Sequence, residues 1–89
     1  MEPKEITAVR RRLGLGQTEL ASLMGVHPMT VSRWERGVVP PGAYHGALLS
    51  EFRLAARDKA VRSGFSAALI ATGIMSALYL LLGAARRER

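Results

Sequence analysis

Residues 17–37, QTELASLMGVHPMTVSRWERG, contain two short apolar patterns separated by a glycine. The apolar side chains are Leu20, Ala21, Leu23 and Met24 in the first pattern and Val31 and Trp34 in the second. Spacings of three and four residues put each set on one face of a helix. Between them, Gly25-Val26 predicts a tight turn, because glycine adopts a left-handed backbone at little cost. The stretch therefore predicts two short helices that pack against each other and against a neighbouring element.

The second predicted helix leaves a row of polar side chains facing away from its apolar side. They are Thr30, Ser32, Arg33 and Arg36. Two helices joined by a tight turn, with polar side chains free on the second, are typical of a helix-turn-helix, whose second helix enters the major groove of DNA. We therefore expect residues 28–36 to form a recognition helix.

This part of the chain resembles the Cro/C1-type (phage-repressor-like, XRE-like) helix-turn-helix family. The resemblance covers residues 6–41 and rests on Gln17, Leu20-Ala21, Gly25-Val26, Val31-Ser32, Trp34-Glu35 and Gly37, with Arg10 and Leu13 upstream. It implies an all-α, lambda-repressor-like domain of four to five helices that binds duplex DNA, in a bacterial or phage protein. It also implies a structural ion pair between Arg10 and Glu35, which ties the first helix to the end of the recognition helix.

The family pattern places base-reading side chains on the recognition helix, at Pro28, Met29, Thr30, Ser32 and Arg33. Arg33 can make two hydrogen bonds to O6 and N7 of guanine, and Met29 can touch a thymine methyl. Pro28 and Met29 replace a polar pair often found there, which removes hydrogen-bond readout at two positions. Trp34 shares a face with Val31, so we expect it in the core and not stacked on a base.

Phosphate contacts are expected beside the recognition helix. Gln17 and Thr18 open the preceding helix, where unpaired backbone N–H groups favour an anion, and the family uses the matching glutamine for backbone contact. A structural alternative is that Gln17 or Glu19 caps that helix. His27 is expected to cap the recognition helix or to lie near a phosphate, and Arg36 to contact a phosphate.

The loop after the recognition helix departs from the family pattern. Related repressors often carry basic residues there, whereas residues 38–41 read VVPP. An apolar, stiff loop grips the DNA backbone poorly, so we expect weak binding by a single domain. Dimerisation or a high local concentration would then be needed to raise the affinity.

Helices are also predicted on both sides of the central stretch. Pro3 suits the first turn of a helix that runs to about Arg12. Its apolar stripe is Ile6, Val9 and Leu13, and a later helix after Gly42 carries Tyr44, Leu48, Phe52 and Ala55 at helical spacing, with Leu49 closing the core. We place this domain at residues 1–56, followed by a basic connector at 57–63.

Composition narrows the functional classes. The chain has 89 residues, no cysteine, two histidines and a net charge of +6. This excludes a disulfide framework and a thiolate zinc site, and no metal or other cofactor is expected. An enzyme is disfavoured, because no nucleophile–base pair, phosphate loop or paired carboxylate is visible.

Residues 63–85 form an uncharged segment of 23 residues. As a helix it would be about 34 Å long, enough to cross a hydrocarbon core of about 30 Å. We therefore expect a long apolar helix over residues 64–85 that spans a membrane, with a basic tail at 86–89. Any hinge is expected at Ser63-Gly64. The alternative is a buried dimerisation helix in a soluble protein.

Small residues recur every fourth position in this region. They are Ala60, Gly64, Ala68, Thr72 and Ser76. Such a stripe lets helices approach closely within a bilayer, so we expect a homodimer or higher homo-oligomer. With the N-terminal domain in the cytoplasm, the chain would be tail-anchored in the inner (cytoplasmic) membrane.

Three functions remain open. The first is a membrane-anchored DNA-binding protein that acts as a transcriptional regulator or DNA tether. The second is a membrane-anchored interaction module that binds a cytoplasmic protein, as in the rod-shape protein RodZ. The third is a soluble, cytoplasmic, dimeric repressor of the Cro/C1 type.

Overall fold

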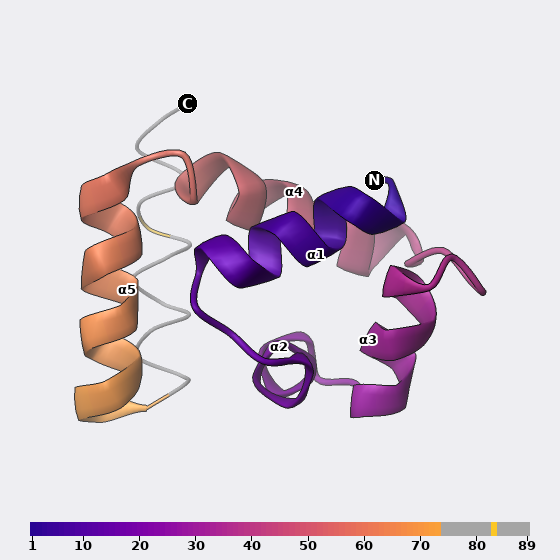
Figure 1. The fold of residues 1–89 in the computed structure, drawn as a ribbon, viewed down its shortest axis with the longest axis horizontal. Coiled ribbons are helices and arrows are strands. Elements are labelled where there is room, and N and C mark those ends of the chain that lie inside the picture. The colour runs from indigo at the N-terminus through magenta and orange to yellow at the C-terminus, as the bar shows by residue number, and fades with distance from the viewer. Residues whose placement is uncertain (74–82, 84–89) are drawn as a thin grey trace.

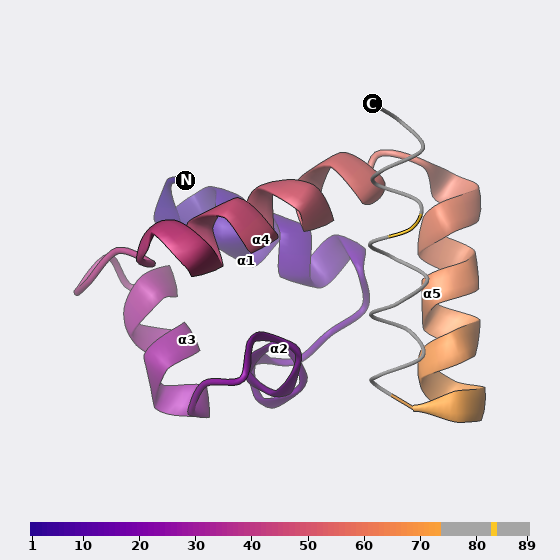
Figure 2. The same ribbon diagram turned by 180° about the vertical axis from the view of Figure 1, so that it is seen from behind.

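The computed structural model describes residues 1–73 and residue 83, and this part of the chain is all-α. Its helices are α1 (Pro3–Arg12), α2 (Gln17–Met24), α3 (Pro28–Glu35), α4 (Ala43–Ala55) and α5 (Lys59–Thr72). α1 and α4 pack against each other, with α2 and α3 below them (Figure 1, Figure 2). Both views place α3 at one end of the fold and α5 at the other.

Local sequence signals explain where the central helices begin and end. Pro28 opens α3, and the preceding His27 caps it by accepting the N–H of Met29 on Nδ1 at 3.0 Å. Gly25 ends α2 in the left-handed conformation, with φ 70°. The N–H of Val26 then bonds to the carbonyl of Ala21 at 3.0 Å, which closes the turn towards α3.

One apolar core joins all five helices. The buried side chains are Ile6, Val9, Leu13, Leu15, Leu20, Ala21, Leu23, Met24, Val31, Trp34, Leu49, Phe52, Ala55, Ala56 and Phe65. Trp34 is therefore a core residue, as its position beside Val31 predicts. Tyr44 is not, although it fits the predicted stripe of α4. It lies in the first turn of that helix, at the edge of the core, and is 71% exposed.

The break between α4 and α5 corrects the expected hinge at residues 63–64, because it lies at residues 56–58 instead. Asp58 starts α5 by accepting the N–H groups of Ala60 and Val61 on Oδ1, at 2.8 and 3.4 Å. A capping carboxylate is a stronger local signal than one glycine within a helix. Ser63 and Gly64 consequently lie inside α5.

The helix predicted over residues 64–85 also differs from the structure. Phe65 is fully buried in the core, so α5 begins as part of the folded domain. α5 ends at Thr72, and Gly73 has φ 94°, which no right-handed helix contains. Among the described residues, no helix combines the length and the apolarity needed to cross a membrane. Residues 74–82 and 84–89, which hold half of the predicted span and the basic tail, lie outside the described residues.

The small-residue stripe is only partly within the described helices. Its first four members, Ala60, Gly64, Ala68 and Thr72, fall in α5 at intervals of four residues. Ser76 lies outside the described residues.

Candidate nucleic-acid interface

The outer face of α3 carries the side chains that are predicted from the sequence to contact DNA. Arg33 and Arg36 are exposed, and Met29 is 49% exposed. Thr30, Ser32 and Pro28 are partly exposed, and His27 and Thr18 are exposed at the starts of α3 and α2. α3 thus presents a polar surface with two cations, while its Val31 and Trp34 face the core.

Arg36 and Ser32 hold each other one helical turn apart. The guanidinium Nε of Arg36 donates to Oγ of Ser32 at 3.1 Å. This bond uses the hydroxyl oxygen as an acceptor and leaves its O–H free to donate to a base or phosphate. The other nitrogens of Arg36 stay available, so the two side chains form one preset contact at the end of α3.

The end of α3 is fixed to α1 by an ion pair with two hydrogen bonds. Arg10 donates from Nε to Oε2 of Glu35 at 2.7 Å and from Nη2 to Oε1 at 3.0 Å. These side chains are only 13% and 6% exposed. Nη1 of Arg10 also donates to the carbonyl of Leu15 at 3.0 Å, so the guanidinium spans α1, α3 and the turn before α2. The pair that the resemblance implies is therefore present in the structure.

The protonation of this pair follows from its surroundings. Burial alone would raise the pKa of Glu35, but hydrogen bonds from Arg10 and Gln17 outweigh it and hold that pKa below its ordinary value of 4.5. The hydrogen bond to Glu35 raises the pKa of Arg10. Both groups are therefore charged near neutral pH.

Gln17 lies between the predicted interface and this ion pair. Its Nε2 donates to Oε1 of Glu35 at 3.1 Å, which leaves one amide hydrogen for a phosphate. Gln17 does not cap α2. That role belongs to Glu19, whose Oε1 accepts the N–H of Gly16 at 2.8 Å. Gln17 thus links the start of α2 to the end of α3.

His45, on α4, is a second tie that sequence reasoning missed. Its Nε2 lies 3.1 Å from the carbonyl oxygen of Met24, at the end of α2. Because a carbonyl oxygen only accepts, Nε2 carries the proton. The same ring lies 5.4 Å from the ring of Trp34 on α3. His45 lies four residues before Leu49 and seven before Phe52, so helical spacing places it on their buried face, although the stripe predicted from Tyr44 does not include it.

An apolar surface adjoins the end of α3. Val38 and Val39 in the following loop are 63% and 42% exposed. A cavity of about 210 Å³ lies beneath this loop, lined by Met1, Glu2, Pro3, Trp34, Gly37, Val39, Pro40 and Pro41. The loop therefore offers apolar contact where a basic loop would bind phosphate.

Comparison with known proteins assigns this sequence to a family. A family model described as helix-turn-helix matches residues 6–52, which is more than half of the chain. The protein belongs to the helix-turn-helix family of Cro/C1 type. It is accordingly a DNA-binding helix-turn-helix protein. No curated protein and no solved structure matches the chain.

Residues 1–73 contain no candidate metal-binding site. No group of three or more His, Asp or Glu side chains able to hold a metal ion occurs there. His27 and His45 are both occupied by contacts to the backbone.

Proposed function

We propose that this helix-turn-helix protein is a membrane-anchored transcriptional regulator or DNA tether. It binds duplex DNA as a dimer, with α3 in the major groove and the start of α2 on the phosphate backbone. Arg33 reads a guanine, Arg36 contacts a phosphate, and Thr30 and Ser32 make polar contacts.

The observation that carries this proposal is the rigid presentation of α3. Its two exposed arginines project from a helix whose end is fixed by Glu35 to both α1 and α2. Such fixing matters because DNA contacts from two helices form together only if their relative angle is set in advance.

A gel shift of the full-length chain with random duplex DNA tests this part. Binding driven by phosphate contacts weakens steeply as salt rises, and loss of one phosphate contact lowers the slope of log K against log salt by about 0.9. We expect Arg36→Gln to reduce that slope by this amount. Arg33→Gln should instead weaken discrimination among sequences. Binding that is independent of salt would contradict the proposal.

Membrane anchoring rests on the uncharged segment at residues 63–85. α5 has 14 residues and is about 21 Å long, less than a hydrocarbon core of about 30 Å. The proposed anchor therefore requires α5 to continue beyond Thr72, with Gly73 in a right-handed conformation in place of its φ of 94°. Alkaline extraction of cell membranes tests it, because an integral protein stays in the membrane pellet. Release of the intact chain into the aqueous fraction would instead favour a soluble dimeric repressor in the cytoplasm.

The proposed dimer is tested by measuring self-association through the small-residue stripe. Replacing Ala68 and Thr72 with leucine should weaken association in a membrane reporter assay, because larger side chains prevent close helix approach. An unchanged signal would contradict this route to a dimer.

A second candidate function is binding of a cytoplasmic protein by the same domain. It is favoured by exposed apolar side chains at both ends of α3. Met29 in the first turn is 49% exposed, and Val38 and Val39 in the loop after the helix are 63% and 42% exposed. Exposed apolar side chains at an interface edge suit a protein surface better than phosphates. Absence of salt-dependent DNA binding, together with retention in the membrane pellet, would favour this function.

A further inference from the structure

A cluster of basic side chains lies at the end of the fold opposite to α3. α1 and α4 both end there, and α5 begins there (Figure 1, Figure 2). The exposed cations at this end are Arg11 and Arg12 in the last turn of α1, Arg57 just after α4, and Lys59 at the start of α5. We call these four residues the basic end.

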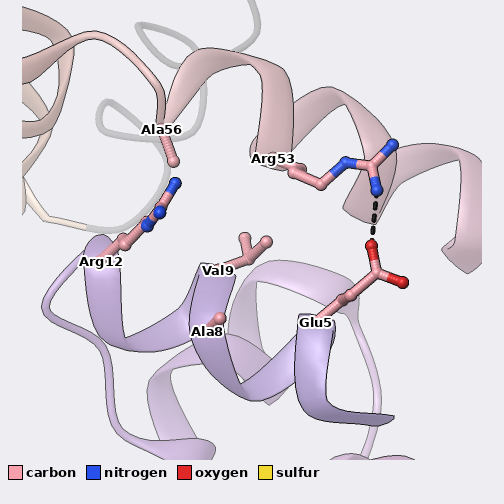
Figure 3. Close-up of a pocket in the computed structure, with 6 residues that line it drawn as sticks. All are labelled: Glu5, Ala8, Val9, Arg12, Arg53 and Ala56. Carbon is pink, nitrogen blue, oxygen red and sulfur yellow. Dashed lines mark hydrogen bonds and ion pairs between the residues drawn. The ribbon is translucent and has the colours of Figure 1, made fainter. Parts of the chain in front are cut away.

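Contacts around Ala56 bring the ends of α1 and α4 together. Arg12 and Arg53 line one cavity of about 140 Å³ with Ala56, Glu5, Ala8 and Val9. Figure 3 shows the guanidinium of Arg12 beside Ala56. Arg62 of α5 donates from Nη1 to the carbonyl of Ala56 at 2.6 Å. Three helices therefore contribute arginines to the surroundings of one residue.

Two of these arginines are already engaged within the fold. Arg53 pairs with Glu5 at 2.6 Å, and Arg62 caps the end of α4. The four residues of the basic end take part in neither ion pair found in residues 1–73. Asp58, the acidic residue between Arg57 and Lys59, is engaged as the cap of α5.

We propose that the basic end docks on the anionic phospholipid headgroups of the membrane that anchors the chain. The inference rests on the proposed anchoring, and the charge is complementary to such a surface. Juxtamembrane basic residues are attracted to an anionic leaflet, and the cluster stands beside the start of the uncharged segment. Because α3 lies at the opposite end, docking leaves the recognition helix away from the bilayer.

Some of these charges have a structural role within the fold. Cations in the last turn of a helix stabilise its negative end, and Arg11 and Arg12 occupy that position in α1. That role would make the variants less stable but would not make any property of the protein depend on lipid charge. The test therefore compares lipid compositions.

Because the sequence contains no cysteine, a single one can carry a fluorophore. We would label Ala8→Cys, an exposed site on α1, and reconstitute the full-length chain into vesicles with a headgroup quencher. The vesicles are phosphatidylcholine alone or phosphatidylcholine with phosphatidylglycerol. Ser22→Cys, exposed on α2, is the control position.

We expect stronger quenching at position 8 in anionic vesicles than in neutral ones, and no such difference at position 22. High salt should remove the difference. The triple variant Arg11→Gln, Arg12→Gln, Arg57→Gln should lower the docking equilibrium on the order of a hundredfold, about fivefold for each arginine. Arg33→Gln with Arg36→Gln is the matched control and should leave docking unchanged.

Equal quenching in both lipid compositions, with the chain still integrated in the vesicles, would overturn the docking proposal and leave the anchor intact. Failure of the chain to float with either vesicle would overturn both. Loss of DNA affinity in the triple variant equal to that of the α3 control would assign the basic end to DNA and also overturn docking. A far-UV circular dichroism spectrum equal to that of the native chain shows that the triple variant is folded.

Discussion

Glu35 is the residue on which the DNA-binding geometry most depends. Its carboxylate is nearly buried and receives hydrogen bonds from side chains on two other helices, Arg10 on α1 and Gln17 on α2. A buried charge without partners is strongly unfavourable, so this carboxylate is tolerated only because those donors converge on it. The same contacts set the position of the end of α3.

Replacing Glu35 with glutamine should reveal both the energy of this pair and its pH dependence. At pH 7 we expect the free energy of unfolding to fall by about 3 kcal/mol, because the largely buried Arg10 charge loses its counterion. In the native protein the pKa of Glu35 is lowered, so its stabilising contribution is complete above pH 4.5 and is lost as pH falls through the lower folded pKa. Urea unfolding, followed by the fluorescence of Trp34, measures this.

As the pH falls below 5, the free energy of unfolding should therefore decrease less for the variant than for the native chain. Parallel pH profiles for the two proteins would show that Glu35 does not titrate differently on folding. Glu19→Gln is the control for replacing a carboxylate that is exposed, because Glu19 caps α2 at the surface.

A substitution at His45 tests whether its hydrogen bond to the carbonyl of Met24 contributes to stability as well. His45→Phe keeps a ring next to Trp34 but leaves the carbonyl of Met24 without its donor. We expect a loss of about 1–3 kcal/mol, which is the usual cost of an unsatisfied buried acceptor. Tyr44→Phe, at a side chain 71% exposed, should change stability by less than about 0.5 kcal/mol. Equal urea midpoints for the two variants would argue against the tie.

At the scale of helices, the sequence predicted elements whose ends are marked by local chemistry. Proline opens α1 and α3, and Gly25 closes α2, because these residues restrict or free the backbone wherever they occur. Two predictions failed for different reasons. The break before α5 follows from a local signal that the prediction passed over, the Asp58 cap, whereas the burial of Phe65 depends on a tertiary contact, the return of α5 to the core.

The site residues divide in the same way. Positions on α3 follow from helical spacing, so the exposed face could be predicted from residues 28–36 alone. The Arg10–Glu35 pair could be expected only from the resemblance, since 25 residues separate its members. For His45, helical spacing from Leu49 indicates the buried face, but its contact to Met24 appears only once α4 crosses the end of α2.

Two glycines in different backbone conformations give opposite predictions for one substitution. At Gly25, with φ 70°, a Cβ would meet no atom within 4 Å, so Gly25→Ala tests backbone strain alone. We expect a loss of about 1–2 kcal/mol, the cost of a left-handed conformation for an L-residue. Gly46 lies inside α4 and also has open space around its Cβ. Gly46→Ala should raise stability by about 0.5–1 kcal/mol, since alanine has the higher helix propensity.

Thermal or urea unfolding of the two alanine variants measures this contrast. A gain at both positions would mean that the turn at Gly25 can relax to a right-handed conformation. A loss at both would mean that the space around Gly46 is not open in solution.

For the whole molecule, the decisive feature is that α5 belongs to the helix-turn-helix core and not only to the apolar segment. Phe65 is fully buried, and Val61 packs partly against the same core. The family match ends at residue 52, so α5 lies outside the matched residues. Packing of α5 also places the start of the uncharged segment at a fixed end of the domain, opposite to α3 (Figure 1).

Phe65→Ala tests this arrangement. If α5 completes the core, the substitution should lower the free energy of unfolding of the DNA-binding domain by about 3–5 kcal/mol, as for other buried phenylalanines. Alanine favours helix formation more than phenylalanine, so a loss cannot come from a weaker α5. Urea unfolding of the full-length chain, monitored by Trp34 on α3, measures the effect at a distance from the substitution. Ser63→Ala, at an exposed position in the same helix, is the matched control and should stay within about 0.5 kcal/mol of the native chain. Native-like stability of Phe65→Ala would mean that the domain folds without α5, and the fixed geometry on which docking of the basic end depends would be lost with it.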